Sequence, residues 1–343
     1  VSMSSRPISL LSPAPGTRSS REASSASIAT RAPSGPAANG DDDAGPAPCP
    51  PALRPAVTEG APEDPAAVFG RMGAVMRLTM ALSAALAALV LGGAALLGPV
   101  PAAAAVVAVI AVIAWGWPRQ MGAPARVSLS VTMFVAGLLG VVVMLAWPRG
   151  GEGLRQSWQL FEPLAVLLAW GTMAAFVVQL VRGTGRPLRL ESTVATMGGV
   201  LLCLSAACWV PLARYAEVPR VAGLAVTLAL AVAGTSLVGL TPWMQGRPRV
   251  LALVMIPASG LVAWLVSMLV GASPAVAPVH VLAALGAATL VALTASTAPT
   301  SRPRPEDRPV GTTLRPRRAG YALAMAPVGA AGIVGHVMLG FLA

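Results

Sequence analysis

Residues 78–98 read LTMALSAALAALVLGGAALLG, a run of 21 residues without a charged side chain. A helix rises about 1.5 Å per residue, so about 20 apolar residues cross the hydrocarbon core of a bilayer. The run is rich in Ala and Leu and lacks the apolar–polar alternation of a membrane-spanning β-strand. It therefore predicts a transmembrane α-helix.

Similar apolar runs recur to the end of the chain and place the membrane domain at residues 75–343. The predicted spans are 78–98, 102–118, 127–147, 160–181, 192–213, 221–241, 250–271, 278–299 and 321–342. The fold class that follows is all-α, a polytopic transmembrane helix bundle of about nine spans.

The composition excludes two broad classes of protein. Of 343 residues, 55% are hydrophobic and 11% are charged, against about 25% charged in an ordinary soluble domain. A soluble globular enzyme is therefore excluded. All 24 basic residues are Arg, and they stand between apolar runs or in a low-complexity tail rather than on a surface with stacking aromatics. We therefore expect the bilayer and other membrane proteins as partners, and no nucleic acid.

Residues 1–74 differ in composition from the rest of the chain. They are rich in Ser, Ala, Pro and Gly and include three consecutive Asp residues at 41–43. Such a segment cannot bury enough apolar surface to offset its ordering entropy, so we expect a disordered cytoplasmic tail. The chain begins with Val1, and Met72 stands directly before the first span. We hypothesise that part of the tail is a gene-start artefact.

The loop arginines predict the orientation. Fifteen fall on one side of the predicted spans and four on the other. The larger set is Arg71, Arg77, Arg119, Arg126, Arg182, Arg186, Arg189, Arg247, Arg249, Arg302, Arg304, Arg308, Arg315, Arg317 and Arg318; the smaller set is Arg149, Arg155, Arg214 and Arg220. Under the positive-inside rule the larger set is cytoplasmic. We expect a multi-pass protein of a bacterial cytoplasmic membrane, with a cytoplasmic N-terminus and an extracytoplasmic C-terminus.

A short pattern recurs in the predicted cytoplasmic loops, about every 62 residues: Gly122-Ala-Pro-Ala-Arg126, Gly185-Arg-Pro-Leu-Arg189 and Gly246-Arg-Pro-Arg249. Each period contains one helical hairpin, so duplication of a two-helix unit is one explanation. The other is that Gly, Pro and Arg stop, turn and anchor any membrane helix. The sequence leaves both open.

Two loop motifs carry a family resemblance: Trp115-Gly-Trp-Pro-Arg-Gln-Met-Gly-Ala-Pro124 and Arg182-Gly-Thr-Gly-Arg-Pro-Leu-Arg-Leu-Glu-Ser192. The chain resembles an uncharacterised family of polytopic integral membrane proteins from high-GC Gram-positive bacteria over most of residues 75–343. The resemblance implies a membrane-embedded fold and assigns no catalytic residues.

The spans are poor in groups that carry chemistry. Between Arg77 and Thr300 there is no Asp, and the Glu residues are Glu152, Glu162, Glu191 and Glu217. Magnesium-dependent chemistry on lipids needs several converging oxygen ligands, usually carboxylates. The cysteine and histidine spacings fit no metal site, and P-loop, HExxH and GxSxG motifs are absent. We expect no metal and no cofactor, and a non-enzymatic role is favoured.

A candidate polar site combines Glu162, His280, His336 and Arg155, which are predicted to lie in or near the outer leaflet. Ionisable groups at membrane depth are candidates for proton-linked or solute-binding sites. Alternatively, Glu162 and His280 are hydrated helix-end residues, and His336 donates to a neighbouring backbone carbonyl. Arg315, Arg317 and Arg318 are candidate contacts for anionic lipid headgroups, or simply topology signals.

Three functions remain open at this point. The first is a transporter or permease for a small or lipidic solute. The second is a non-catalytic subunit of a cell-envelope membrane complex, and the third is a membrane-embedded lipid or isoprenoid enzyme with its active site on the outer face. The glycines of the last span, from Gly329 to Gly340, and its Pro327 fit close helix packing or a lined path for a solute.

Overall fold

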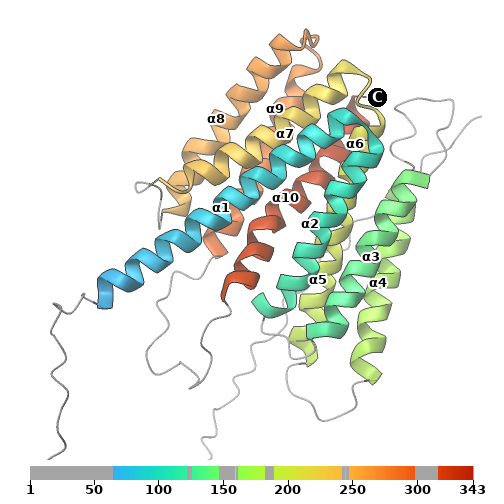
Figure 1. Cartoon of the computed structure of the whole chain (residues 1–343). Coiled ribbons are helices and arrows are strands. Elements are labelled where there is room, and N and C mark those ends of the chain that lie inside the picture. The colour runs from blue at the N-terminus through green and yellow to red at the C-terminus, as the bar shows by residue number, and fades with distance from the viewer. Residues whose placement is uncertain are drawn as a thin grey trace, which may run out of the picture. The chain divides into compact units, whose positions relative to one another are not determined.

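The computed structural model describes residues 65–121, 126–146, 159, 161–181, 189–241, 244, 247–297 and 316–342. This part of the chain is all-helical and contains no strand (Figure 1). Its helices are α1 (Pro65–Leu97), α2 (Pro99–Gln120), α3 (Arg126–Ala146), α4 (Phe161–Val181), α5 (Arg189–Ala207), α6 (Trp209–Arg214), α7 (Pro219–Val238), α8 (Pro248–Leu269), α9 (Ala277–Thr297) and α10 (Pro316–Phe341).

Nine stretches among the described helices are long and apolar enough to cross a membrane. Each of their ends lies within three residues of the predicted span end, so the predicted fold class is confirmed. Helices α5 and α6 share one of these stretches, Ser192–Arg214. The agreement is close because hydrophobic length alone sets where a helix enters and leaves the hydrocarbon region.

Proline and glycine set several helix ends. Pro99, Pro219 and Pro248 each begin a helix, where a missing N–H costs no hydrogen bond. Gly271 ends α8 with a φ of 68°, and the N–H of Ala272 donates to the carbonyl of Ser267 at 2.9 Å. A left-handed residue after the last turn is the usual glycine-terminated helix end. Of the predicted tail, residues 1–64 lie outside the described part, whereas residues 65–74 form the first turns of α1.

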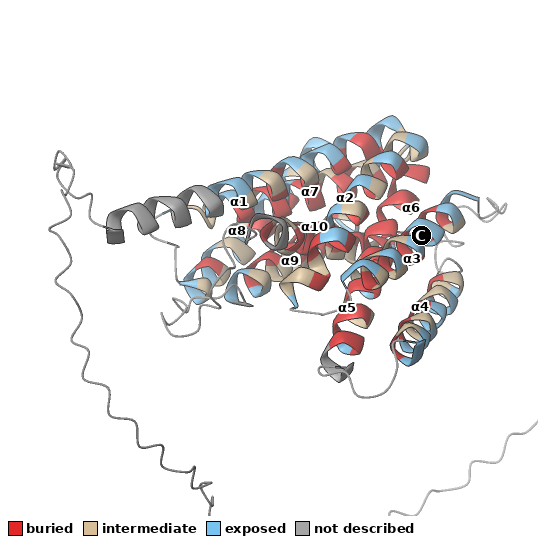
Figure 2. Ribbon diagram, turned by 60° about the horizontal axis from the view of Figure 1, so that its bottom comes forward, coloured by how far each residue is buried: buried red, intermediate tan, exposed pale blue. Residues whose placement is uncertain are grey.

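Helix α10 lies among the other helices and packs against α1, α2, α5, α6, α7 and α9. On one side α2, α3, α4 and α5 pack together, and on the other side α1, α7, α8 and α9 do so (Figure 1). The span formed by α5 and α6 is the most buried, and α4 is the least buried (Figure 2). The packed centre therefore lies where α10 meets α5 and α6.

The helical hairpins differ from one another. Helices α8 and α9 pack along their length, whereas α7 packs on α6 and hardly on α5. Most residues of the recurring loop pattern lie outside the described part of the chain. The duplication hypothesis therefore gains nothing from the packing of the hairpins.

Candidate functional site at the crossing of α10 and the broken span

The span Ser192–Arg214 is broken between α5 and α6. Pro211 has no N–H, so the carbonyl of Ala207, four residues earlier, cannot receive its usual helical hydrogen bond. The N–H of Cys208 donates to the carbonyl of Ser205, three residues back, at 3.2 Å, so the helix tightens at that residue. The break therefore follows from the sequence Cys208-Trp-Val-Pro211.

Helix α10 crosses this break with its glycines. A Cβ added to Gly329 would lie 3.3 Å from both the carbonyl oxygen of Leu202 and the Cβ of Ala206. At Gly332 an added Cβ would collide with the carbonyl oxygen of Ser205 and lie 2.7 Å from the Trp209 ring. Glycine is needed at position 332 because the two backbones approach too closely there for a side chain.

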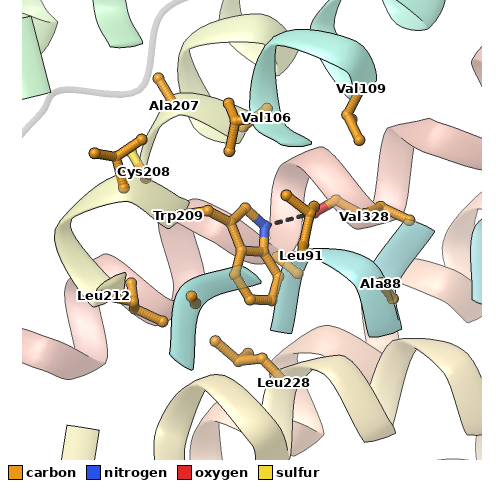
Figure 3. Packing of buried hydrophobic residues seen from close by; sticks show 14 of the residues in the cluster. Ala88, Leu91, Val106, Val109, Ala207, Cys208, Trp209, Leu212, Leu228 and Val328 are labelled. Atoms are coloured by element: carbon orange, nitrogen blue, oxygen red, sulfur yellow. Dashed lines mark hydrogen bonds between the residues drawn. The ribbon is translucent and has the colours of Figure 1, made fainter. Parts of the chain in front are cut away.

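Trp209 is the largest side chain at the crossing and is fully buried. Its indole N–H donates to the carbonyl of Val328 at 2.9 Å, and Figure 3 shows side chains of Leu91, Val106 and Leu228 around the ring. Trp209 lies near the end of the predicted span 192–213, and tryptophan near a span end commonly lies at the membrane interface. In the structure its indole N–H is satisfied by a carbonyl of α10 instead.

His336 lies four residues after Gly332 and on the same face of α10. Its side chain is fully buried, and neither Nδ1 nor Nε2 has a hydrogen-bond partner among the described residues. The ring of Phe161, the first residue of α4, lies 4.4 Å away between centroids at an interplanar angle of 53°. The carbonyl acceptor that would make His336 a purely structural residue is thus missing from the described part.

Glu162 follows Phe161 and lies in the first turn of α4, with its side chain exposed. A carboxylate at this end of a helix complements the helix dipole. Through Phe161, the structure brings the start of α4 to His336. Arg155, the fourth member of the predicted set, lies outside the described residues.

His280 is also fully buried, in the first turn of α9, but both of its ring nitrogens are engaged. Nδ1 lies 2.7 Å from the hydroxyl oxygen of Ser267 in α8, and Nε2 lies 2.8 Å from the carbonyl oxygen of Arg220 in α7. His280 therefore links three helices and has no ring nitrogen left for Glu162 or His336.

Arginines at the helix ends of the described part have different surroundings. Arg214, at the end of α6, is buried and donates from Nη1 to the carbonyl of Met144 in the last turns of α3 at 2.6 Å. Arginine at that position satisfies a carbonyl of α3 that has few other donors. Of the candidate lipid contacts, Arg317 and Arg318 lie in the first turn of α10, and Arg315 lies outside the described part.

Within the described ranges, no group of three or more His, Cys, Asp or Glu side chains could hold a metal ion. Cys203 and Cys208 are both buried and free. What the crossing offers chemically is one imidazole, a neighbouring aromatic ring and the backbone carbonyls at the helix break.

The chain matches no protein-family model, no curated protein sequence and no solved structure. The family resemblance carried by the two loop motifs therefore stays a prediction. The class of protein rests on the fold itself, which is a helical bundle with nine apolar helices of membrane-spanning length in its described part.

Proposed function

We propose that the protein is a proton-linked transporter for a small or lipidic solute, with His336 as the proton-binding residue. The observation that carries the proposal is that His336 is fully buried and both ring nitrogens lack a partner among the described residues. Buried polar groups are nearly always hydrogen-bonded, because an unpaired one costs about 1–3 kcal/mol. During the transport cycle, a bound solute would supply the hydrogen-bond partners that the ring lacks, including an acceptor for the second N–H once the ring takes up a proton.

The helix break supports the same function. Transporters build their sites where membrane helices are interrupted, because freed backbone carbonyls can then contact a solute or an ion. Pro211 interrupts the span formed by α5 and α6, and Gly332 brings α10 against the carbonyl of Ser205 at that point. His336 lies one turn further along α10.

The surroundings of His336 favour a solute with apolar surface. Phe161 contacts the imidazole, and Leu212 and Leu228 lie against neighbouring Gly335. Glu162 is the acidic residue of α4 and follows Phe161 directly. These groups suit a small neutral or lipidic molecule, and they offer no cluster of cationic side chains for a phosphate.

The proposed location is a bacterial cytoplasmic membrane, with the N-terminus in the cytoplasm and the C-terminus outside. Consecutive spans run in opposite directions (Figure 1), so Arg77, Arg119, Arg126 and Arg249 fall at one end of the bundle, opposite Arg214 and Arg220. This asymmetry supports the orientation, which would place His336 in the outer half of the membrane. Reporter fusions to the C-terminus test it.

The function is tested with proteoliposomes that contain a trapped pH-sensitive dye. Gradients of monosaccharides, short-chain alcohols and short-chain isoprenyl alcohols are imposed one at a time. We expect at least one solute to drive proton movement, and the His336→Gln variant to lose this movement while still folding. The proposal fails if no solute moves protons, or if the His336→Gln variant moves them as fast as the unmodified protein.

A second candidate is a subunit of a membrane complex that docks through α4. Trp170 lies at the middle of the span Phe161–Val181 and is 66% exposed, and Met173 and Phe176 are exposed near it. Tryptophan prefers the membrane interface to its centre, so an exposed ring at mid-span favours a protein neighbour. A photocrosslinking residue at position 170 tests this: capture of a stoichiometric protein partner favours the complex, and lipid adducts alone reject it.

A further inference from the structure

The surroundings of His280 contain more hydrogen-bond acceptors than a neutral imidazole needs. The carbonyl of Arg220 lies 2.8 Å from Nε2, and the Ser267 hydroxyl lies 2.7 Å from Nδ1. The same hydroxyl lies 2.9 Å from the carbonyl oxygen of Ala263, one turn earlier in α8. Ser267, Ala263 and the imidazole are buried, and Arg220 is partly buried.

With a neutral ring, the positions of the protons are fixed. A carbonyl only accepts, so Nε2 must carry the hydrogen and donate to Arg220. Nδ1 is then an acceptor, and the Ser267 hydroxyl must donate its one proton to Nδ1. In this state the carbonyl of Ala263 receives nothing from Ser267.

With a charged ring, both nitrogens donate. Nε2–H still donates to the carbonyl of Arg220, and Nδ1–H now donates to the Ser267 oxygen. The Ser267 proton is released from that interaction and can turn to the carbonyl of Ala263, which is already within hydrogen-bond distance. Every polar hydrogen has an acceptor in either charge state, and no heavy atom has to move.

We propose that His280, Ser267 and Ala263 form a proton-operated latch that joins α9 to α8 and α7. Uptake of one proton by Nδ1 rotates the Ser267 hydroxyl, adds the hydrogen bond to Ala263 and makes both bonds of the ring charge-assisted. Charge-assisted hydrogen bonds are roughly twice as strong as neutral ones, so both bonds of the ring are stronger in the charged form than in the neutral form.

The charges around the latch act in opposite directions. Ser267 lies in the last turn of α8, whose negative helix end favours a cation, whereas His280 lies in the first turn of α9, whose positive helix end disfavours one. Arg220, the charged residue of α7, disfavours a positive charge on His280. Exposed Glu217 precedes that helix. On α8 the charged residue is Arg249, at the far end, and α9 has no charged side chain. From α10, which packs against α9, the titratable groups are His336 and Tyr321, with Arg317 and Arg318 in its first turn.

The lack of a side chain at Gly223 leaves the space for the ring. A Cβ added to Gly223 in α7 would lie 3.0 Å from Cε1 of His280. The imidazole is therefore held between α7 and α8 in one orientation, with its two nitrogens aimed at their partners. The latch does not depend on the proposed transport function, because it uses neither His336 nor the crossing.

The experiment is ¹⁵N NMR of histidine-labelled full-length protein in lipid bilayers between about pH 8 and pH 4. The chain has two His residues, so the His336→Gln variant assigns both sets of signals. At high pH we expect His280 to be the Nε2–H tautomer with Nδ1 accepting a hydrogen bond. At low pH we expect the imidazolium signals of His280 while the backbone spectrum stays folded.

A control variant is needed to separate the loss of the bond to His280 from the general effect of removing a buried hydroxyl of α8. Ser259 is also a buried serine of α8, but its hydroxyl bonds the carbonyls of Ile256 and Ala284 rather than a histidine. The Ser267→Ala variant should shift the Nδ1 resonance of His280 by several ppm at high pH, and the Ser259→Ala variant should leave it unchanged. The Nδ1–H tautomer, a ring that stays neutral until the helices unfold, or equal spectra for both serine variants would each overturn the proposal.

Discussion

The two histidines of this protein occupy opposite kinds of surroundings within one helical bundle. His280 sits at the junction of α7, α8 and α9 with a partner for each ring nitrogen. His336 sits where α10 passes the broken span, equally buried, with a partner for neither nitrogen among the described residues. Burial is the same, so the difference lies in which groups the neighbouring helices present.

That difference separates the junction of α7, α8 and α9, which His280 joins, from the crossing of α10 and the broken span, where we propose the proton-binding site. The first region satisfies its imidazole from a serine and a carbonyl, and its ring bridges three helices. At the crossing, the backbones of α10 and the broken span approach closely at Gly332, and the His336 imidazole has no hydrogen-bond partner among the described residues. Strain or incomplete bonding held in place by a rigid surrounding structure is what functional sites show.

The largest expected loss of stability comes from removing Trp209, the side chain that packs at the crossing of α10 and the broken span. Trp209→Ala deletes the fully buried indole and its hydrogen bond to Val328, leaving a cavity beside α10. We expect a loss of about 3–5 kcal/mol in the free energy of unfolding. Denaturant unfolding in detergent micelles measures it, with Trp170→Ala on the exposed face of α4 as the control. Equal losses for the two variants would show that Trp209 has no special place in the packing.

The next effect tests the close approach of the backbones. Gly332→Ala places a Cβ against the carbonyl of Ser205, so α10 must move away, at a cost of about 1–3 kcal/mol. Gly93→Ala in α1 is the matched control, because nothing lies within 4 Å of its added Cβ. That control should be neutral or stabilising by up to about 1 kcal/mol, since alanine is the better helix former. Thermal unfolding of both variants measures the contrast, and similar midpoints would contradict it.

A smaller loss of stability is expected at the junction of α7, α8 and α9 around His280. His280→Leu removes two hydrogen bonds and leaves the carbonyl of Arg220 without its side-chain donor. Side-chain hydrogen bonds between membrane helices contribute about 0.6 kcal/mol on average, so we expect a loss of about 1–2 kcal/mol. Hydrogen exchange should rise at the start of α9 and the end of α8. Unchanged exchange there would mean that His280 does not join these helices.

Much of the fold could be predicted from the sequence, because hydrophobic length and proline position act locally. The span ends agree to within three residues, and Pro99, Pro219 and Pro248 begin helices. The break before Pro211 could have been predicted in the same way, since a proline lacks the N–H that a continuous helix needs. The break is hard to see in the sequence because the apolar run continues through it without interruption.

Less of the candidate site could be predicted. The depth of His280 and His336 follows from their positions in the spans, but the identity of their neighbours depends on how the helices pack. Ser267 is 13 residues from His280 and Arg220 is 60 residues away, and no local pattern connects them. Trp209 shows the same limit, because an interfacial and a central tryptophan look alike in a sequence until the facing helix is known.

The most direct test applies one substitution to both histidines. In the same lipid, His336→Leu should leave the unfolding midpoint unchanged or raise it, because the change removes two unpaired buried nitrogens, and it should abolish solute-driven proton movement. His280→Leu should lower the midpoint instead. If His336→Leu lowers the midpoint as much as His280→Leu does and transport survives, then His336 is a structural residue and the account of its role is wrong.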